Sequence, residues 1–232
     1  MKRVDWRGAI AATGFRTLPE VFWHKYCDRA LCEINRSAPR RSRAGVRNAL
    51  RLSPVAGVAL DPEMMEFARA VLGADAFPFR ATLFDRSPAA NWLVVWPEDT
   101  ALPLPARMDL PGGGGGPWSV KEEIDHAHAP AAALGQVLTL RVSFDDSTAG
   151  NGPLRVLRGT HTRGVLSDDS IHELPSQTPP VECTVPKGGV LAMRPLLEHA
   201  SSKSQTEVPR RVLHIEYAAS ESIAKPFELV IA

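Results

Sequence analysis

The chain has 232 residues, 44% of them hydrophobic and 23% charged, with 27 Lys and Arg against 26 Asp and Glu and a formal net charge of +1. This composition is typical of a globular protein with a sizeable core, and the balanced charge excludes the overall attraction on which nonspecific nucleic-acid binding depends. No run of 18 apolar residues is present and the N-terminus lacks a long apolar signal segment, so we expect no membrane contact and a cytoplasmic location. The three cysteines lack metal-binding spacing and are expected to be free thiols.

The N-terminal quarter is predicted to be helical. Residues 17–20, TLPE, are typical of a capping box with an early proline, and apolar residues then recur at helical spacing as far as Ile34. A second helix is predicted to begin at Asp61 and Pro62 and to end at Gly73.

An arginine-rich segment separates these two helices. Residues 36–51 hold six arginines and no acidic residue. The segment is either a solvated loop and helix start or a rim that docks an anionic substrate, because guanidinium groups pair well with carboxylate and phosphate. No aromatic residues are interleaved to stack on bases, so nucleic acid is not an expected partner. Arg43 and Arg47 are candidate substrate contacts.

From about residue 77 the pattern changes to short apolar runs separated by Gly, Pro, Asn and Asp. The runs include FRATLF, WLVVW, LTLRVSF, LRVLRG, VECTV, GVLAM and RVLHIEY. Such a pattern indicates many short strands, and helical segments do not alternate regularly with them. We therefore predict a single domain, 1–232, that is mainly β with helices: a jelly-roll core over 77–218, a mainly helical N-terminal layer over 1–76, and a tail over 219–232.

The longest irregular stretch runs from Thr100 to Pro130 and contains five consecutive glycines. The glycines lead into Pro117 and Trp118 rather than into the Gly-Lys-Ser/Thr ending of a phosphate-binding loop. We expect a flexible surface loop, and loops of this length often cover active sites. Trp118 is a further candidate substrate contact.

Four of the seven histidines fall into two groups. His126 and His128 lie close together, and His199 and His214 flank a polar loop between two predicted strands. Arg210 follows His199 by eleven residues, so such a loop can bring an imidazole and a guanidinium to one cavity. A lone histidine near a strand is more often structural, and this alternative stays open. The serines after His199 lack the GxSxG context of a hydrolase.

The sequence resembles the phytanoyl-CoA dioxygenase family of iron(II)- and 2-oxoglutarate-dependent oxygenases. The similarity lies in NWLVVWPED (91–99), GPWSVKEEIDHAHAP (116–130), residues 138–161, and RPLLEHASS with PRRVLHIEY (194–217), in the family's order from about residue 40 to about 218. The resemblance implies a cupin-like double-stranded β-helix. It also implies Fe(II) and 2-oxoglutarate as cofactors, molecular oxygen and a small organic molecule as substrates, and a monomer or homodimer. The arginine-rich segment favours an anionic substrate.

The same resemblance implies roles for five residues. Asp99 would be the carboxylate ligand of iron and His199 the distal histidine ligand. Arg210 would pair with the far carboxylate of 2-oxoglutarate, and Ser201 would donate a hydrogen bond to that carboxylate. Arg141 occupies a strand position that faces the cosubstrate in the family. A planar guanidinium suits bidentate carboxylate binding.

One departure from the family's pattern concerns the metal. The family has a histidine ligand two residues before the aspartate, and this chain has Pro97 there, which carries no donor atom. Three explanations are open: an active oxygenase in which Glu98, His126 or His128 supplies the third ligand, a catalytically impaired relative that binds small molecules, or a recently decayed enzyme. Loss of one imidazole is expected to weaken iron binding severely.

Overall fold

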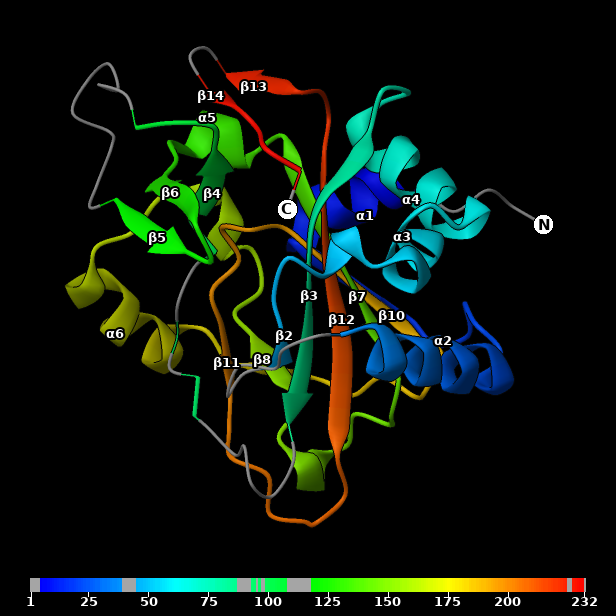
Figure 1. The fold of residues 1–232 in the computed structure, drawn as a ribbon. Helices are drawn as coiled ribbons and strands as arrows, with labels where there is room; N and C mark the ends of the chain where they lie inside the picture. The colour runs from blue at the N-terminus through cyan, green and yellow to red at the C-terminus, as the bar shows by residue number, and fades with distance from the viewer. Residues whose placement is uncertain are drawn as a thin grey trace.

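The computed structural model describes residues 5–38, 45–86, 93–94, 96, 99–107, 118–224 and 227–231. The glycine run, Arg43, Pro97 and Glu98 lie outside these ranges. Figure 1 shows a large sheet with helices on one side and smaller sheets on the other.

The large sheet has six antiparallel strands in the order β1-β10-β7-β12-β3-β2. In that order they comprise Phe15–Leu18, Val190–Met193, Val137–Ser143, Arg210–Ala218, Phe77–Arg86 and Gly45–Val46. β12 is the central strand: it pairs with β3 along its whole length and with β7 from Val212 to Ala218. The three strands are rich in Val, Leu, Ile and Phe, residues that pack well on a pleated surface.

Side chains alternate between the two faces of this sheet, as the strand period of two requires. On β12, Leu213, Ile215 and Tyr217 belong to the main apolar core, whereas Arg210 and His214 line a cavity on the opposite face. The Tyr217 hydroxyl donates to the carbonyl of Ala59 at 2.8 Å, which ties the sheet to the helical layer.

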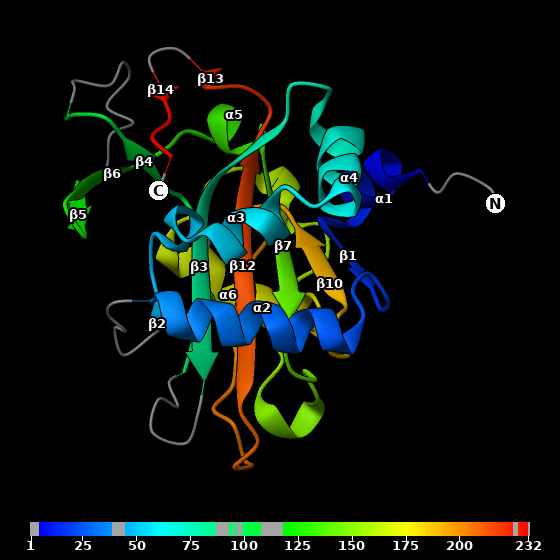
Figure 2. The same ribbon diagram turned by 45° about the vertical axis from the view of Figure 1, so that its right-hand side comes forward.

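Four helices cover the core face of the sheet, as Figure 2 shows for α2 and α3 in front of β3, β12 and β7. They are α1 (Trp6–Thr13), α2 (His24–Ser37), α3 (Ser53–Ala59) and α4 (Pro62–Leu72), with a short 3-10 helix η1 (Ala49–Arg51) before α3. The predicted limits of α4 are confirmed, because Asp61 caps its start and Gly73 its end. The predicted capping box at 17–20 is wrong.

The chain at Thr17 and Leu18 is extended because both residues pair with β10 in the sheet. Tertiary pairing overrides the local capping signal here. α2 begins only at His24, after Trp23, with no side-chain cap, and it carries Cys27 and Cys32 as predicted. All three cysteines are free, which confirms the prediction.

Two three-stranded sheets and short helices lie on the other side of the large sheet. One sheet has the order β11-β8-β9 and the other β4-β6-β5, and β13 pairs with β14 near the C-terminus. The strands are β4 (Ala101–Leu104), β5 (Ser119–Lys121), β6 (Ile124–His128), β8 (Leu154–Val156), β9 (Val181–Cys183), β11 (His199–Ser201), β13 (Ser222–Ala224) and β14 (Phe227–Glu228). The helices are α5 (Ala131–Leu134), η4 (Ala149–Asn151), η5 (Thr160–Arg163) and α6 (Asp168–Gln177).

The expectation of one irregular loop over 100–130 is wrong for the described part of that stretch. β4, β5 and β6 form a sheet there, because Leu102 and Leu104 of β4 and Ala127 of β6 are buried in a second apolar cluster. The mainly β architecture with an N-terminal helical layer is confirmed. Within the described residues, no helix has the length and apolar character needed to cross a bilayer.

Candidate active site

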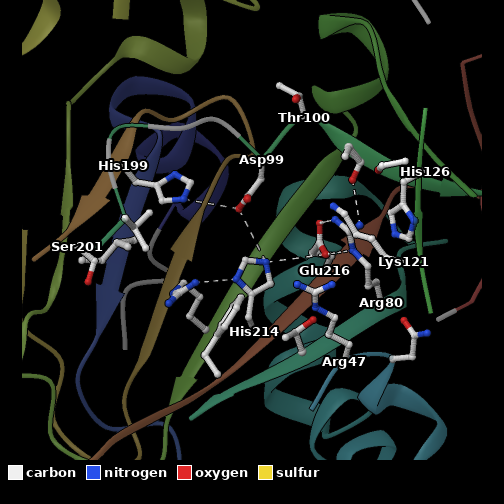
Figure 3. A pocket seen from close by; sticks show the side chains of 18 of the residues that line it. Arg47, Arg80, Asp99, Thr100, Lys121, His126, His199, Ser201, His214 and Glu216 are labelled. Carbon is white, nitrogen blue, oxygen red and sulfur yellow. Dashed lines mark hydrogen bonds and ion pairs between the residues drawn. The ribbon is translucent and has the colours of Figure 1, made fainter. Parts of the chain in front are cut away.

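A cavity of about 420 Å³ opens between the large sheet and the smaller sheets (Figure 3). Its floor consists of alternate residues of β3 and β12 and of Arg141 from β7, and its walls come from β5, β6, β11 and the segment before β4. The polar lining residues are Arg47, Asn48, Arg80, Thr82, Arg86, Asp99, Thr100, Ser119, Lys121, His126, His128, Arg141, His199, Ser201, Arg210, His214 and Glu216.

Asp99 and His199, the two predicted metal ligands, face each other in this cavity. Oδ2 of Asp99 lies 3.9 Å from Nε2 of His199. Both residues are held by backbone pairing: the Asp99 N–H donates to the carbonyl of Pro195, and His199 opens β11 opposite Val156 of β8. The structure therefore brings together residues that are 100 positions apart in the chain.

The protonation of His199 suits a metal ligand. Its Nδ1 lies 2.9 Å from the carbonyl oxygen of Leu197, which can only accept, so Nδ1 carries the proton. In the neutral ring Nε2 then presents its lone pair towards Asp99. Oδ2 of Asp99 is buried and has no hydrogen-bond partner among the described residues. A buried carboxylate oxygen opposite a free imidazole lone pair fits a divalent cation, whose bonds to such ligands are about 2 Å long.

His214, which the sequence analysis assigned no role, is the third side chain at this point. Its Nε2 lies 4.0 Å from Oδ2 of Asp99 and 3.9 Å from Oε2 of Glu216. Its Nδ1, however, lies 2.7 Å from Nη1 of Arg141, which can only donate. Nδ1 is therefore the acceptor, and Nε2 of the neutral ring carries the proton. His214 thus directs an N–H, not a lone pair, towards the carboxylates.

The surroundings of Asp99 favour its ionised carboxylate. Burial opposes ionisation, but the neighbouring imidazoles of His199 and His214 and the guanidinium charges of Arg80 and Arg141 lower the pKa of Asp99 below its ordinary value. The pKa of His214 falls to about 3, because burial and then the Arg141 charge disfavour its protonated form. At neutral pH the carboxylate therefore stands beside a neutral His214.

The two described candidates for a substitute third ligand, His126 and His128, lie elsewhere on the cavity wall. Figure 3 shows Lys121 and Arg80 between Asp99 and His126. Nδ1 of His126 is 3.0 Å from the carbonyl of Ile124, and Nδ1 of His128 is 2.6 Å from the Thr100 hydroxyl. Within the described ranges no three His, Cys, Asp or Glu side chains gather into a metal-binding group, and Glu98 is outside them.

The predicted 2-oxoglutarate residues Arg210, Ser201 and Arg141 also line the cavity. Nη2 of Arg210 lies 3.3 Å from the Ser201 hydroxyl oxygen, and Nε of Arg210 donates to the carbonyl of Asn151 at 3.3 Å. The Ser201 hydroxyl itself donates to the carbonyl of Gly152 at 2.8 Å. Gly152 has φ of +68°, and a side chain there would meet the Ser202 carbonyl at 2.2 Å, so the turn that aims this carbonyl requires glycine.

Arg86, a residue that the sequence analysis missed, completes this end of the cavity. Nη1 of Arg86 donates to the Ser201 hydroxyl at 2.8 Å. In the pairing of β3 with β12, Arg86 lies directly opposite Arg210. Burial, with Arg86 and Arg141 nearby, lowers the pKa of Arg210 to about 9, and burial lowers that of Arg141 to about 10. No carboxylate among the described residues pairs with Arg141 or Arg210. Closely spaced buried cations of this kind fit a dianion.

Of the missed residues Arg86, His214 and Glu216, the last two could have been found from strand alternation. If Arg210 faces the cavity, His214 and Glu216 must face it too, because they lie four and six residues along the same strand. The sequence does not reveal the pairing register that places Arg86 beside them. Of the predicted substrate contacts, Arg47 lines the cavity, whereas Trp118 packs against the second apolar cluster and does not line it.

His126 makes a testable contribution to the pH dependence of stability. Burial, with Arg80 and Lys121 nearby, lowers its pKa to about 4 against a hydrogen bond to Ile124 that acts in the opposite direction. In the unfolded chain this histidine takes up its proton near pH 6.5. The contribution of neutral His126 to the free energy of unfolding is therefore fully present above that pH and is lost as the pH falls towards 4. Between pH 7.5 and 5 the loss due to His126 is expected to be about 2 kcal/mol.

Denaturant unfolding at the two pH values checks this expectation. The loss of unfolding free energy between pH 7.5 and 5 is expected to be about 2 kcal/mol smaller in His126→Gln than in the wild type. It is expected to be unchanged in the control His172→Gln, whose exposed side chain lies on α6. Equal losses in the wild type and His126→Gln would show that His126 is not neutral in the folded protein.

Comparisons with known sequences and structures relate the chain to one protein family and one fold. The phytanoyl-CoA dioxygenase family (PhyH) matches residues 35–212 of the chain. EctD from S. alaskensis, solved with 2-oxoglutarate and 5-hydroxyectoine, is similar in structure with a TM-score of 0.71 and 19% identity over 97% of this chain and 79% of that one. The 2-oxoglutarate-dependent epimerase SnoN from nogalamycin biosynthesis gives a TM-score of 0.67 and 17% identity over 94% and 82%.

A third similar structure, AviO1 from Streptomyces viridochromogenes Tue57, gives a TM-score of 0.65 and 20% identity over 97% of this chain and 98% of that one. A search of curated protein sequences gives no match. The likeness to these structures confirms the predicted cupin-like jelly-roll fold. Because the family match spans most of its length, the chain belongs to the phytanoyl-CoA dioxygenase family of iron(II)- and 2-oxoglutarate-dependent oxygenases.

Proposed function

We propose that the protein is an iron(II)- and 2-oxoglutarate-dependent dioxygenase of the hydroxylase type with an altered metal site, acting on a small organic molecule. The observation that carries this proposal is the pairing of two features in one cavity. First, the buried Oδ2 of Asp99 faces the Nε2 lone pair of His199. Second, buried arginines line the same cavity around Ser201, and no described carboxylate pairs with Arg141 or Arg210.

Asp99 and His199 would hold the metal, and Arg210 with Arg86 would hold the far carboxylate of 2-oxoglutarate. When bound, iron(II) and 2-oxoglutarate supply the oxidising chemistry, in which oxygen converts 2-oxoglutarate to succinate and carbon dioxide and one oxygen atom goes to the substrate. The carbonyls of Asn151 and Gly152 hold Arg210 and Ser201 in place before any ligand arrives. Such preorganisation reduces the cost of ordering side chains on binding.

His214 orients the groups around the metal position. It is fixed through Nδ1 by Arg141, and its Nε2–H points between Asp99 and Glu216. At 4.0 Å this N–H is too far from Oδ2 of Asp99 for a hydrogen bond, but its polarity favours the ionised form of the carboxylate. The side chain of Arg141 is thereby held at the cavity floor as well.

A second candidate is a noncatalytic protein that binds 2-oxoglutarate or a related dianion. Pro97 favours it, because proline offers no metal ligand at the position where the family has histidine. The geometry of His214 also favours it, because the proton on Nε2 prevents that ring from replacing the missing ligand. The arginine cluster around Ser201 would serve either function.

Metal content and succinate release separate the two candidates. The purified protein is expected to bind iron(II) and to release succinate from 2-oxoglutarate, and Asp99→Asn is expected to lose both while Asp75→Asn, an exposed control, loses neither. Binding of 2-oxoglutarate without iron or succinate would support the binding protein. Absence of iron, succinate and 2-oxoglutarate binding would contradict both.

A further inference from the structure

A second group of cations stands at the mouth of the cavity. Figure 3 shows Ser201 and His199 on one side of Asp99 and Arg47, Lys121 and His126 on the other. Arg47 follows β2, which pairs with β3, and Lys121 ends β5 in a different sheet. Arg47 is exposed and Lys121 is half-buried. Two cations from unconnected elements therefore converge on the same opening.

The other charged groups on this side are already neutralised. Arg80 forms an ion pair with Glu216 in which its Nε and Nη2 each donate to one carboxylate oxygen. Its Nη1 donates to the carbonyl of Ala101 at 2.9 Å. Glu216 is buried and its carboxylate is used by that pair. His126 is neutral at physiological pH because burial lowers its pKa. Arg47 and Lys121 thus carry the excess positive charge.

Neither Arg47 nor Lys121 has a carboxylate within ion-pair distance among the residues that the structure describes. Their mutual proximity is unfavourable: burial, and then the charges of Arg80 and Arg47, lower the pKa of Lys121. Folding has left this repulsion in place at the opening of a cavity. An anion bound between the two side chains would relieve it.

The charge of the whole cavity leads to the same conclusion. Its lining contains six Arg and Lys side chains and two carboxylates, Asp99 and Glu216. A divalent metal ion adds two positive charges and 2-oxoglutarate removes two, so the loaded cavity keeps a large positive excess. Since the arginines near Ser201 would be occupied by 2-oxoglutarate, the excess at the mouth is available to the substrate.

We propose that Arg47 and Lys121 form the substrate-recognition subsite, which binds a carboxylate or phosphate group of the substrate at the cavity mouth. This inference rests on the proposed oxygenase function, because it makes the arginines near Ser201 the cosubstrate site. The anionic group would anchor one end of the substrate, and the remainder would extend past the Arg80–Glu216 pair towards Asp99. The substrate is therefore a small organic anion.

The subsite is tested by NMR titration of the full chain with inorganic phosphate and, separately, with acetate, in the presence of saturating 2-oxoglutarate and without oxygen. We expect saturable shifts of the backbone amides of Arg47 and Lys121. Arg47→Gln and Lys121→Gln are each expected to weaken binding of the preferred probe at least fivefold. The charge-matched controls Arg51→Gln and Lys25→Gln, which alter exposed residues outside the cavity, are expected to leave it unchanged.

The two probes identify the anionic group, because tighter binding of phosphate assigns a phosphoryl substrate and tighter binding of acetate a carboxylate. Equal affinity in the wild type and both subsite variants would overturn the inference, as would phosphate shifts confined to Arg86 and Arg210. If 2-oxoglutarate fails to bind while the Arg47 and Lys121 shifts remain, the anion subsite stands and the oxygenase proposal fails.

Discussion

Replacing Arg210 by glutamine is expected to weaken the binding of 2-oxoglutarate severely. Arg210 is buried, its Nη2 and Nε bind the Ser201 hydroxyl and the carbonyl of Asn151, and no described carboxylate neutralises it. A ligand carboxylate would therefore form its main ion pair here. Removing one partner of a buried charge pair costs about 2 to 5 kcal/mol, so we expect a loss of affinity of about 100-fold.

Titration calorimetry with manganese(II) in place of iron measures this loss without turnover. The matched control is Arg211→Gln, the same substitution one residue further along β12. Arg211 points to the opposite face, where its Nε and Nη2 bind Asp145 at 2.7 and 2.6 Å. We expect its 2-oxoglutarate affinity to equal that of the wild type.

Stability of the ligand-free protein provides a second control on Arg210. Burial and the neighbouring Arg86 and Arg141 already disfavour its charge, as its lowered pKa of about 9 indicates. Arg210→Gln is therefore expected to unfold at an equal or higher denaturant concentration, because residues kept for binding often reduce stability. Unchanged 2-oxoglutarate affinity in this stable variant would contradict the assignment of Arg210.

Restoring the family's histidine with Pro97→His is expected to produce a large gain in iron(II) affinity. Position 97 lies two residues before Asp99, and a histidine there would add a third ligand to Asp99 and His199. Loss of a group that merely orients a ligand costs about 10- to 100-fold in metal affinity, so adding a ligand should gain about 100-fold or more. Competition with a chelator under anaerobic conditions measures the affinity.

Pro97→Ala is the control, because it removes the proline without adding a donor atom and is expected to give no gain. A third variant, Pro97→His with His199→Ala, is expected to return to weak binding. If the wild type already binds iron(II) as tightly as Pro97→His, a third protein ligand must exist in the wild type, and the interpretation of Pro97 as a lost ligand would be wrong.

The sequence by itself determined those features that depend on neighbouring residues. The limits of α4 follow from Asp61 and Gly73, which act on the helix ends next to them. The strands β3, β7 and β12 follow from runs of Val, Leu, Ile and Phe, whose preference for a pleated surface is local. The family motif around Asp99 and His199 is likewise contained in short segments, and so is the absence of a histidine at position 97.

Only the tertiary structure decided which side chains share the cavity and in what protonation state. The register of β3 against β12 places Arg86 opposite Arg210, and pairing with β10 makes Thr17 extended despite its capping pattern. The proton of His214 is on Nε2 because Arg141, 73 residues away, donates to Nδ1. Registers and proton positions depend on partners that are distant in the chain, and local composition does not contain that information.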